Sequence, residues 1–211
     1  METQVLYLAS SNPGKQREFC EAAAPRGITV TMLPDFRNLP PCVEDGATFE
    51  ENAVKKAVHY SRDFSGWVFA DDSGLAVDAL GGAPGVHSAR FAGRGATDEE
   101  NNERLLAELR RAEVELQAKA GEGAAEPLNR AAHYVCVIAL ARRGQVITTV
   151  EGRADGVIID EPRGQGGFGY DPYFFYPPFG KTFAEISADE KFSVSHRGIA
   201  FRRLLDALCR A

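Results

Sequence analysis

A chain of 211 residues is long enough to bury a substantial core, and 44% hydrophobic with 26% charged residues is an ordinary globular composition. The net charge of −6 argues against a broad contact with a nucleic acid polymer, although it allows a small anionic ligand. No apolar run approaches the roughly 18 residues of a membrane span, and no basic segment precedes an apolar one in the opening METQVLYLAS. We expect a cytoplasmic protein that binds neither a membrane nor a nucleic acid polymer.

The cysteines are widely spread and contain no CxxC pair of the kind that holds zinc or performs redox chemistry; they are Cys20, Cys42, Cys136 and Cys209. Reduced thiols are therefore expected. Because no internal repeat and no second core pattern is present, residues 1–211 are expected to form a single domain.

The first motif is a strand, a turn of small residues and a helix. Gln4–Ala9 predicts the strand, and Asn12 followed by Pro13 is typical of the start of a helix, here running to about Ala24. Free N–H groups at such a helix start, with Lys15 beside them, form a natural anion site. The glycine and the Ser/Thr that a Walker A loop requires are absent. The alternative is an ordinary capped turn without a ligand.

A second strand is predicted over Ile28–Leu33. Thr48–Glu51 then forms a capping box that opens the next helix, so Glu51 is expected to be used by the cap. Glu44 lies in the loop before this helix and is freer to reach a metal or a ligand. Asn52 is either a surface residue or a buried polar contact.

The most informative stretch follows a short apolar run, Trp67–Ala70, which is typical of a buried strand. Asp71, Asp72 and Ser73 come at the expected end of this strand, where ligands bind in open α/β sheets. Because successive strand side chains point to opposite faces, only one of the two aspartates is expected to face a given site. The alternative is an Asx turn, in which these residues only supply turn oxygens.

Further along, Thr97–Glu100 forms a second capping box, which opens a helix to about Lys119. Its polar composition predicts that this helix faces solvent. Residues 121–129 are expected to be a flexible connector. The segments 133–141 and 145–150 flank Arg-Arg-Gly and predict a hairpin.

The C-terminal third contains a glycine-rich loop. Gly164–Gly169 satisfies GxGxxG but precedes Tyr170 and Asp171 rather than a helix, so a dinucleotide fingerprint is excluded by its context. A loop that displays Phe168, Tyr170 and Asp171 is suited to hold a flat ligand by stacking. The alternative for Phe168 is packing in the core.

The last helix opens at Ser195. His196 and Arg197 lie in its first turn, with Lys191 just before it, and cations at this end oppose the helix dipole. This placement predicts a ligand that supplies hydrogen-bond acceptors, and the alternative is a solvated basic turn.

Together these segments resemble the Ham1/RdgB-type inosine triphosphate pyrophosphatases, which remove deaminated purine nucleotides such as dITP, ITP and XTP. The resemblance spans nearly the whole chain in the family's order, through Ser10–Lys15, Glu44–Ala53, Ala70–Arg90, Gly166–Pro172, Lys181–Glu185, Glu190–Lys191 and Ser195–Arg197. It implies an α/β fold with an elongated mixed central β-sheet flanked by helices, two lobes with a cleft between them, and a homodimer.

The resemblance also implies a role for individual residues. Asp72 is implied as the general base for water, and Glu44 and Asp72 as the carboxylates that bind Mg²⁺, with Mn²⁺ as an alternative metal. Contacts to the nucleotide substrate are implied for Ser10, Ser11, Asn12, Pro13, Gly14, Lys15, Ser73, Phe168, Gly169, Tyr170, Asp171, Lys191, His196 and Arg197.

The implied reaction is NTP + H₂O → NMP + PPi, with attack of water on the α-phosphorus. One rival is a Maf-type pyrophosphatase that acts on modified pyrimidines or methylated bases. The other is a nucleotide-binding sensor that uses the same residues without turnover.

Overall fold

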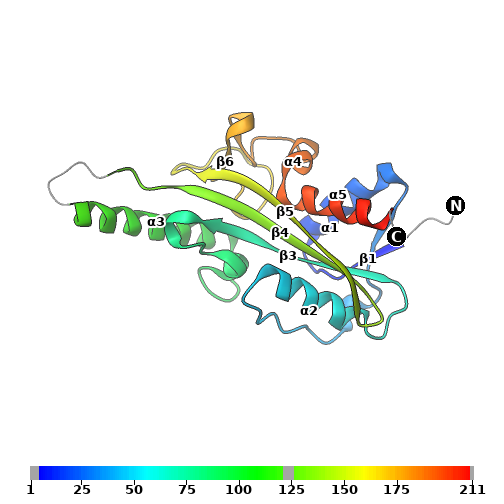
Figure 1. The fold of residues 1–211 in the computed structure, drawn as a ribbon. Coiled ribbons are helices and arrows are strands. Elements are labelled where there is room, and N and C mark those ends of the chain that lie inside the picture. The colour runs from blue at the N-terminus through cyan, green and yellow to red at the C-terminus, as the bar shows by residue number, and fades with distance from the viewer. Residues whose placement is uncertain (1–4, 121–125, 210–211) are drawn as a thin grey trace. The chain divides into compact units, whose positions relative to one another are not determined.

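The computed structural model describes residues 5–120 and 126–209, which form a mixed seven-stranded sheet together with helices (Figure 1). The strand order is β2-β1-β3-β4-β5-β6-β7. β1 is parallel to β2 and β3, whereas β6 is antiparallel to β5 and β7. The α/β class and the mixed sheet are therefore confirmed.

The strands are β1 (Val5–Leu8), β2 (Thr29–Met32), β3 (Trp67–Val77), β4 (Ala131–Arg142), β5 (Gln145–Ile158), β6 (Phe174–Tyr176) and β7 (Lys181–Thr182). The helices are α1 (Pro13–Ala23), α2 (Phe49–Ser61), α3 (Asp98–Ala120), α4 (Ala188–Val194) and α5 (His196–Leu208), with short 3₁₀ turns η1 (Ala24–Arg26), η2 (Phe36–Asn38), η3 (Asp78–Leu80), η4 (Gly85–Arg90) and η5 (Pro177–Phe179).

The chain groups into two compact units. Within the described residues, the first unit comprises 5–73, 135–153 and 189–209, and the second comprises 74–120, 126–134 and 154–188. The strands β3, β4 and β5 contribute residues to both units.

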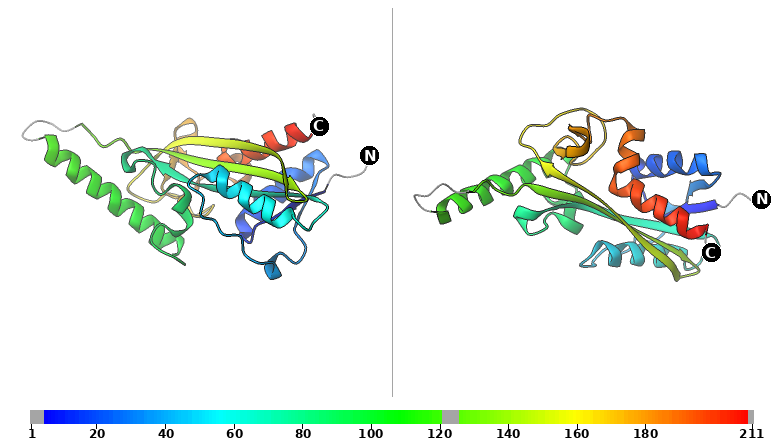
Figure 2. Two further views of the ribbon diagram at one scale, coloured as in Figure 1. Left: turned by 60° about the horizontal axis from the view of Figure 1, so that its bottom comes forward. Right: turned by 45° about the horizontal axis from the view of Figure 1, so that its top comes forward.

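In the first unit, helices lie on both faces of the sheet. α1 and α5 lie on one face and α2 on the other, as Figures 1 and 2 show. Phe69 packs against Phe19 of α1 and Phe201 of α5, with ring centroids 5.2 and 5.9 Å away. Val68 and Ala70 belong to the separate buried cluster that includes α2. The alternation over Trp67–Ala70 therefore assigns each of these four residues to one helical layer.

The predicted capping boxes are confirmed. Thr48 Oγ1 accepts the N–H of Glu51 at 3.1 Å, and the Glu51 carboxylate accepts the N–H of Ala47 at 2.6 Å. Glu51 is thus used by the cap, as expected. Thr97 and Glu100 bond each other reciprocally, at 2.7 and 3.2 Å.

The predicted hairpin is also confirmed. β4 and β5 are neighbours joined by Arg143 and Gly144, whose φ angles of 51° and 75° are those of a tight two-residue hairpin turn. The expectation that α3 faces solvent is only partly correct, because Leu105 and Leu109 are fully buried on one side of the helix. The proposed connector falls partly outside the described residues, as does Gln4.

α5 begins directly against β5. A Cβ on Gly152 would lie 2.1 Å from the carbonyl oxygen of His196 and 2.4 Å from the nitrogen of Ala200. Only glycine allows so close a backbone approach, so this position of β5 sets where the first turn of α5 lies.

All four cysteines are free thiols. Over residues 5–120 and 126–209, no helix has the length and apolar character needed to cross a membrane.

Candidate active site

The predicted anion-binding turn forms the start of α1. Ser10 Oγ accepts the N–H of Asn12 at 3.2 Å, and Asn12 Oδ1 accepts the N–H of Lys15 at 3.1 Å. Asn12 is therefore the N-cap and Pro13 the first helical residue, as predicted. Ser11, Asn12 and Pro13 are exposed, and the helix end beside them carries a partial positive charge. The turn is suited to an anion.

The sequence prediction for the end of β3 was wrong. The strand does not stop at Ala70 but continues without interruption to Val77, so Asp71, Asp72 and Ser73 lie inside it. The Asx-turn alternative is excluded by the same observation. These polar residues are tolerated in a strand because ammonium, guanidinium and amide groups from the helices on each face pair with them.

Asp71 faces the α1 and α5 side of the sheet. Its carboxylate lies 2.7 Å from the ammonium of Lys15 and 3.8 Å from the guanidinium of Arg197, and the side chain is fully buried. Burial alone would raise the pKa of Asp71, but the charges of Lys15 and Arg197 lower it below its ordinary value. Asp71 is therefore an ionised anchor for these two cations near neutral pH.

Asp72 faces the α2 side. Lys56 Nζ donates to its carboxylate at 3.1 Å and Asn52 Nδ2 at 3.2 Å. Burial raises the pKa of Asp72 above its ordinary value, and the attraction of Lys56 offsets only part of that effect. The expectation that the two neighbouring aspartates face different sides is therefore confirmed, and Asp72 is the more basic carboxylate of the two.

Glu44 converges on the same ammonium. Lys56 Nζ donates to its carboxylate at 2.7 Å, so Lys56 links Glu44 to Asp72. Burial alone would lower the pKa of Lys56, but the nearby carboxylates raise it and keep the side chain charged. Asn52, which the sequence left undecided, is buried and fixes the loop next to Glu44 by accepting the N–H of Gly46 at 2.8 Å.

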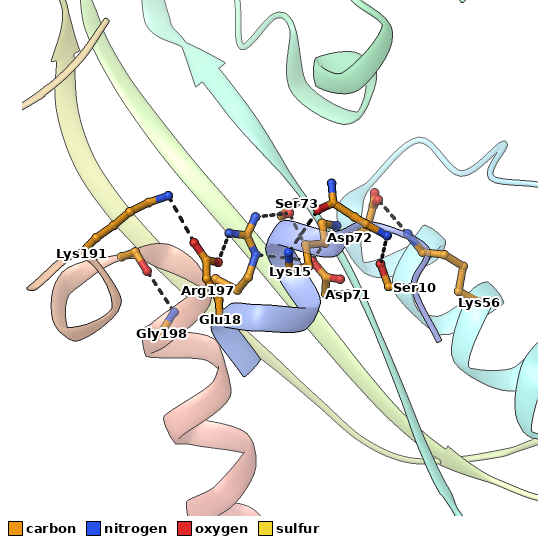
Figure 3. A network of polar contacts seen from close by, with 12 residues as sticks. Ser10, Lys15, Glu18, Lys56, Asp71, Asp72, Ser73, Lys191, Arg197 and Gly198 are labelled. Carbon is orange, nitrogen blue, oxygen red and sulfur yellow. Dashed lines mark hydrogen bonds and ion pairs between the residues drawn. The ribbon is translucent and has the colours of Figure 1, made fainter. Parts of the chain in front are cut away.

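The first turn of α5 joins this network from the other side (Figure 3). Arg197 donates to the carboxylate of Glu18 and, at 3.2 Å, to Ser73 Oγ. Lys191 of α4 lies 3.3 Å from the same Glu18 carboxylate. Glu18 and Ser73 of the protein itself thus accept from Arg197, and the ligand expected at this basic turn stays a prediction.

Burial and the neighbouring cations together set the charge states of Glu18 and His196. It would raise the pKa of Glu18, but Arg197 and Lys191 lower it and keep the carboxylate ionised. Burial, with the charges of Arg197 and Lys191, holds the pKa of His196 well below its ordinary value. His196 is therefore neutral near pH 7, which the sequence left open.

The glycine-rich loop belongs to the second unit. It leads into β6 rather than a helix, which confirms that it is no dinucleotide fingerprint. Tyr170 and Asp171 are buried, and Phe168 and Gly169 are half-buried. Tyr170 Oη donates to the carbonyl of Ser88 at 2.8 Å, and Asp171 accepts the N–H of Phe168 at 2.8 Å. These two side chains thus shape the loop, and Phe168 and Gly169 are more accessible than Tyr170 and Asp171.

The donor set at Glu44 and Asp72 fits a magnesium ion. No group of three or more His, Cys, Asp or Glu side chains in the described part of the chain is arranged as a metal cage. Mg²⁺, however, is commonly held by one or two carboxylates together with substrate phosphates and water. Two carboxylates that already converge on one cation, the Lys56 ammonium, match this requirement.

Sequence reasoning missed two residues of the network, Lys56 and Glu18, and left a third, Asn52, undecided. All three lie inside helices, where a polar residue looks like part of a solvated face. The helical spacing of Asn52 and Lys56, four residues apart and both facing β3, is the one local signal that could have drawn attention to them.

Comparison with known proteins gives a consistent result. The model of the Ham1 family matches residues 6–207. A dITP/XTP pyrophosphatase from Syntrophobacter fumaroxidans is 48% identical over 204 residues, which are 97% of this chain and 82% of that protein. A dITP/XTP pyrophosphatase from Thermus thermophilus is 48% identical over 202 residues, 96% of this chain and 90% of that protein. A HAM1 protein from Coxiella burnetii aligns with a TM-score of 0.84 at 37% identity, covering 99% of this chain and 100% of that one.

Proposed function

The chain belongs to the Ham1 family, and we propose that it hydrolyses the deaminated purine nucleoside triphosphates dITP, ITP and XTP to the monophosphate and pyrophosphate. The family resemblance in the sequence is thereby confirmed over nearly the whole chain. The observation that carries the reaction is the convergence of Glu44 and Asp72 on one cation, the Lys56 ammonium. The charge of Lys15, at the start of α1, also acts on Asp72.

In this proposal Glu44 and Asp72 hold Mg²⁺, which supplies neutralisation of the polyphosphate charge when bound. Lys15 and the N–H groups at the start of α1 bind the phosphates and stabilise the charge that develops on the leaving pyrophosphate. Ser10 to Gly14 shape that turn. Ser73, Lys191, His196 and Arg197 contribute to nucleotide binding from the same unit.

Asp72 acts as the general base. A new bond forms between the water oxygen and the α-phosphorus, the bond from the α-phosphorus to the bridging oxygen breaks, and the proton of the water passes to the Asp72 carboxylate. A raised pKa makes this carboxylate a stronger base than an ordinary aspartate. Asn52 and Lys56 hold the carboxylate in place by their hydrogen bonds.

Selectivity is proposed to come from the six position of the purine. Hypoxanthine and xanthine present an acceptor at O6 and a donor at N1, and adenine reverses that pattern. Donors from Arg197, or from backbone N–H groups of the loop other than those of Phe168 and Gly169, which Asp171 and Asp98 already accept, would be left unpaired by adenine, and such mismatches discriminate strongly. Tyr170 and Asp171 maintain the loop for this contact.

We further propose that residues 1–211 act as one catalytic domain, that the enzyme works as a homodimer, and that it is cytoplasmic. The free state of all four cysteines agrees with a reducing compartment.

The test is pyrophosphate release from dITP, ITP, XTP, dATP, dGTP and a methylated pyrimidine triphosphate, each with and without Mg²⁺. We expect fast, Mg²⁺-dependent release from the first three only. Preference for the pyrimidine would favour the Maf-type rival, and binding of dITP without any pyrophosphate release would favour the sensor.

A further inference from the structure

The loop from Gly167 to Asp171 is a tight turn. Gly167 and Gly169 have φ angles of 73° and 64°, in the left-handed region that favours glycine. Asp171 Oδ2, which accepts the N–H of Phe168, would lie only 2.0 Å from a Cβ on Gly167. The turn is therefore closed on itself by the Asp171 carboxylate.

Two side chains of α3 form hydrogen bonds to the backbone in the middle of this turn. The Asp98 carboxylate accepts the N–H of Gly169 at 2.6 Å, and Asn102 Nδ2 donates to the Gly169 carbonyl at 3.0 Å. Asp98 and Asn102 are four residues apart and so lie on one side of the helix. Because one bond holds the peptide before Gly169 and the other the peptide after it, α3 fixes the direction of the backbone between Phe168 and Tyr170.

A third anchor lies at Tyr170, which is 4% exposed. Its hydroxyl donates to the carbonyl of Ser88, whose own hydroxyl accepts the N–H of Leu75 at 2.9 Å and donates to the carbonyl of Gly85 at 2.6 Å. Tyr170 is thus tied to the end of β3 and to η4, and the turn is held from both sides.

The stability of α3 does not explain why residue 102 is an asparagine. Its Oδ1 atom is buried and accepts no hydrogen bond from the described residues. Leaving a buried acceptor unpaired is unfavourable, so an apolar side chain would suit the helix better at this position. The bond from Nδ2 to Gly169 is what an apolar residue would lose.

We propose that Asp98 and Asn102 are positioning residues that orient the backbone of the 167–171 loop and thereby set the selectivity for the purine base. The inference rests on the proposed function, in which the loop contacts the base. Neither residue touches substrate in this proposal; both act through Gly169.

The test compares four variants of the full chain: Asp98→Ala, Asp98→Asn, Asn102→Leu and Glu99→Ala. The measured quantity is the ratio of kcat/KM for dITP to kcat/KM for dATP, from pyrophosphate release with Mg²⁺. Asp98→Ala and Asn102→Leu are expected to reduce this ratio on the order of tenfold, because misplaced binding groups lose discrimination. Asp98→Asn should restore it, since an amide oxygen accepts the same N–H bond.

Glu99→Ala is the matched control, because it removes an exposed carboxylate from the same first turn and should leave the ratio unchanged. A second readout is the amide signal of Gly169 in ¹⁵N-labelled protein. Asp98→Ala should weaken its hydrogen bond, seen as an upfield proton shift and faster exchange, and Asp98→Asn should largely retain it.

The outcomes separate the two proposals. Wild-type protein that releases no pyrophosphate from dITP would overturn the proposed function and this inference with it. An active wild type, together with Asp98→Ala and Asn102→Leu variants whose ratio stays within about twofold of it, would overturn the positioning role alone; the twofold limit lies far below the effect of a misplaced binding group.

Discussion

Asp71 and Asp72 are neighbours in β3, yet their carboxylates pair with lysines from helices on opposite faces of the sheet. The first lies 2.7 Å from Lys15 of α1, and the second 3.1 Å from Lys56 of α2. Their pKa values move in opposite directions, lowered for Asp71 by cations that outweigh its burial and raised for Asp72 by burial. One strand thus places an ionised anchor on one face and, on the other, the carboxylate that we propose as the base.

Glu44→Gln is predicted to raise the Mg²⁺ concentration for half-maximal activity about tenfold, the equivalent of roughly 1.4 kcal/mol of binding. The variant loses one of the two carboxylates proposed to hold the ion, while Lys56 keeps its bond to Asp72. The measurement is a Mg²⁺ titration of dITP hydrolysis. Asp45→Asn is the control, because Asp45 lies in the same loop but pairs with Lys55 and not with Lys56. An unchanged Mg²⁺ requirement in Glu44→Gln would remove Glu44 from the metal site.

Glu18→Gln is predicted to lower the free energy of unfolding by about 1–3 kcal/mol, because the buried cations of Lys191 and Arg197 lose their shared counter-charge. Urea denaturation measures this change. Glu21→Gln, on the exposed side of the same helix, should have no comparable effect. Equal stability of the two variants would mean that the Glu18 pairs contribute nothing to the fold.

Because His196 is buried and neutral, we expect the free energy of unfolding to depend on pH. Burial holds its pKa in the folded protein well below the value near 6.5 of an unfolded chain. Below about pH 6.5 the unfolded chain binds a proton that the folded protein does not bind. The free energy of unfolding therefore decreases as the pH is lowered, by up to roughly 1.4 kcal/mol per pH unit. His196→Gln should remove this part of the slope between pH 6.5 and 5.

The control for this series is His87→Gln, since His87 is exposed. Chemical denaturation at several pH values gives the slope for each protein. A slope that His196→Gln leaves equal to that of the wild type would show that His196 does not stay neutral in the folded state.

Gly152→Ala is predicted to destabilise the protein by about 1–3 kcal/mol or more, because the new methyl group would overlap backbone atoms of α5 that cannot move independently. For a chain of this size, each 1 kcal/mol lowers Tm by roughly 2–4 °C. Val146→Ala, at an exposed site of the same strand, should change Tm much less. A normal Tm for Gly152→Ala would contradict the close packing of β5 on α5.

Much of the fold follows from local sequence signals. Asn12, Thr48 and Thr97 each predict a helix start, and the structure confirms every one because a cap depends only on residues within one turn. The end of β3 could not be predicted in the same way. Asp71 to Gly74 resemble a turn by composition, and they form a strand because Lys15, Lys56 and Arg197 arrive from distant helices.

The residues of the candidate site also differ in whether a local sequence signal reveals them. Glu44 and Asp72 were found from the sequence because acidic residues in a loop and beside a buried strand are conspicuous. Lys56 and Glu18 were not found, because a charged residue inside a polar helix has no local mark that distinguishes it from solvated neighbours. Their roles depend on tertiary contacts alone.

The central claim is that Asp72 is the base of a pyrophosphatase acting on deaminated purine nucleotides. It is tested most directly by the rate of pyrophosphate release from dITP by Asp72→Asn, compared with Asp45→Asn and wild type at saturating Mg²⁺. We predict that Asp72→Asn folds with nearly the wild-type Tm and loses a factor on the order of 10²–10⁴ in kcat, the usual contribution of a general base. A folded Asp72→Asn protein that releases pyrophosphate within a few-fold of the wild-type rate would contradict the account.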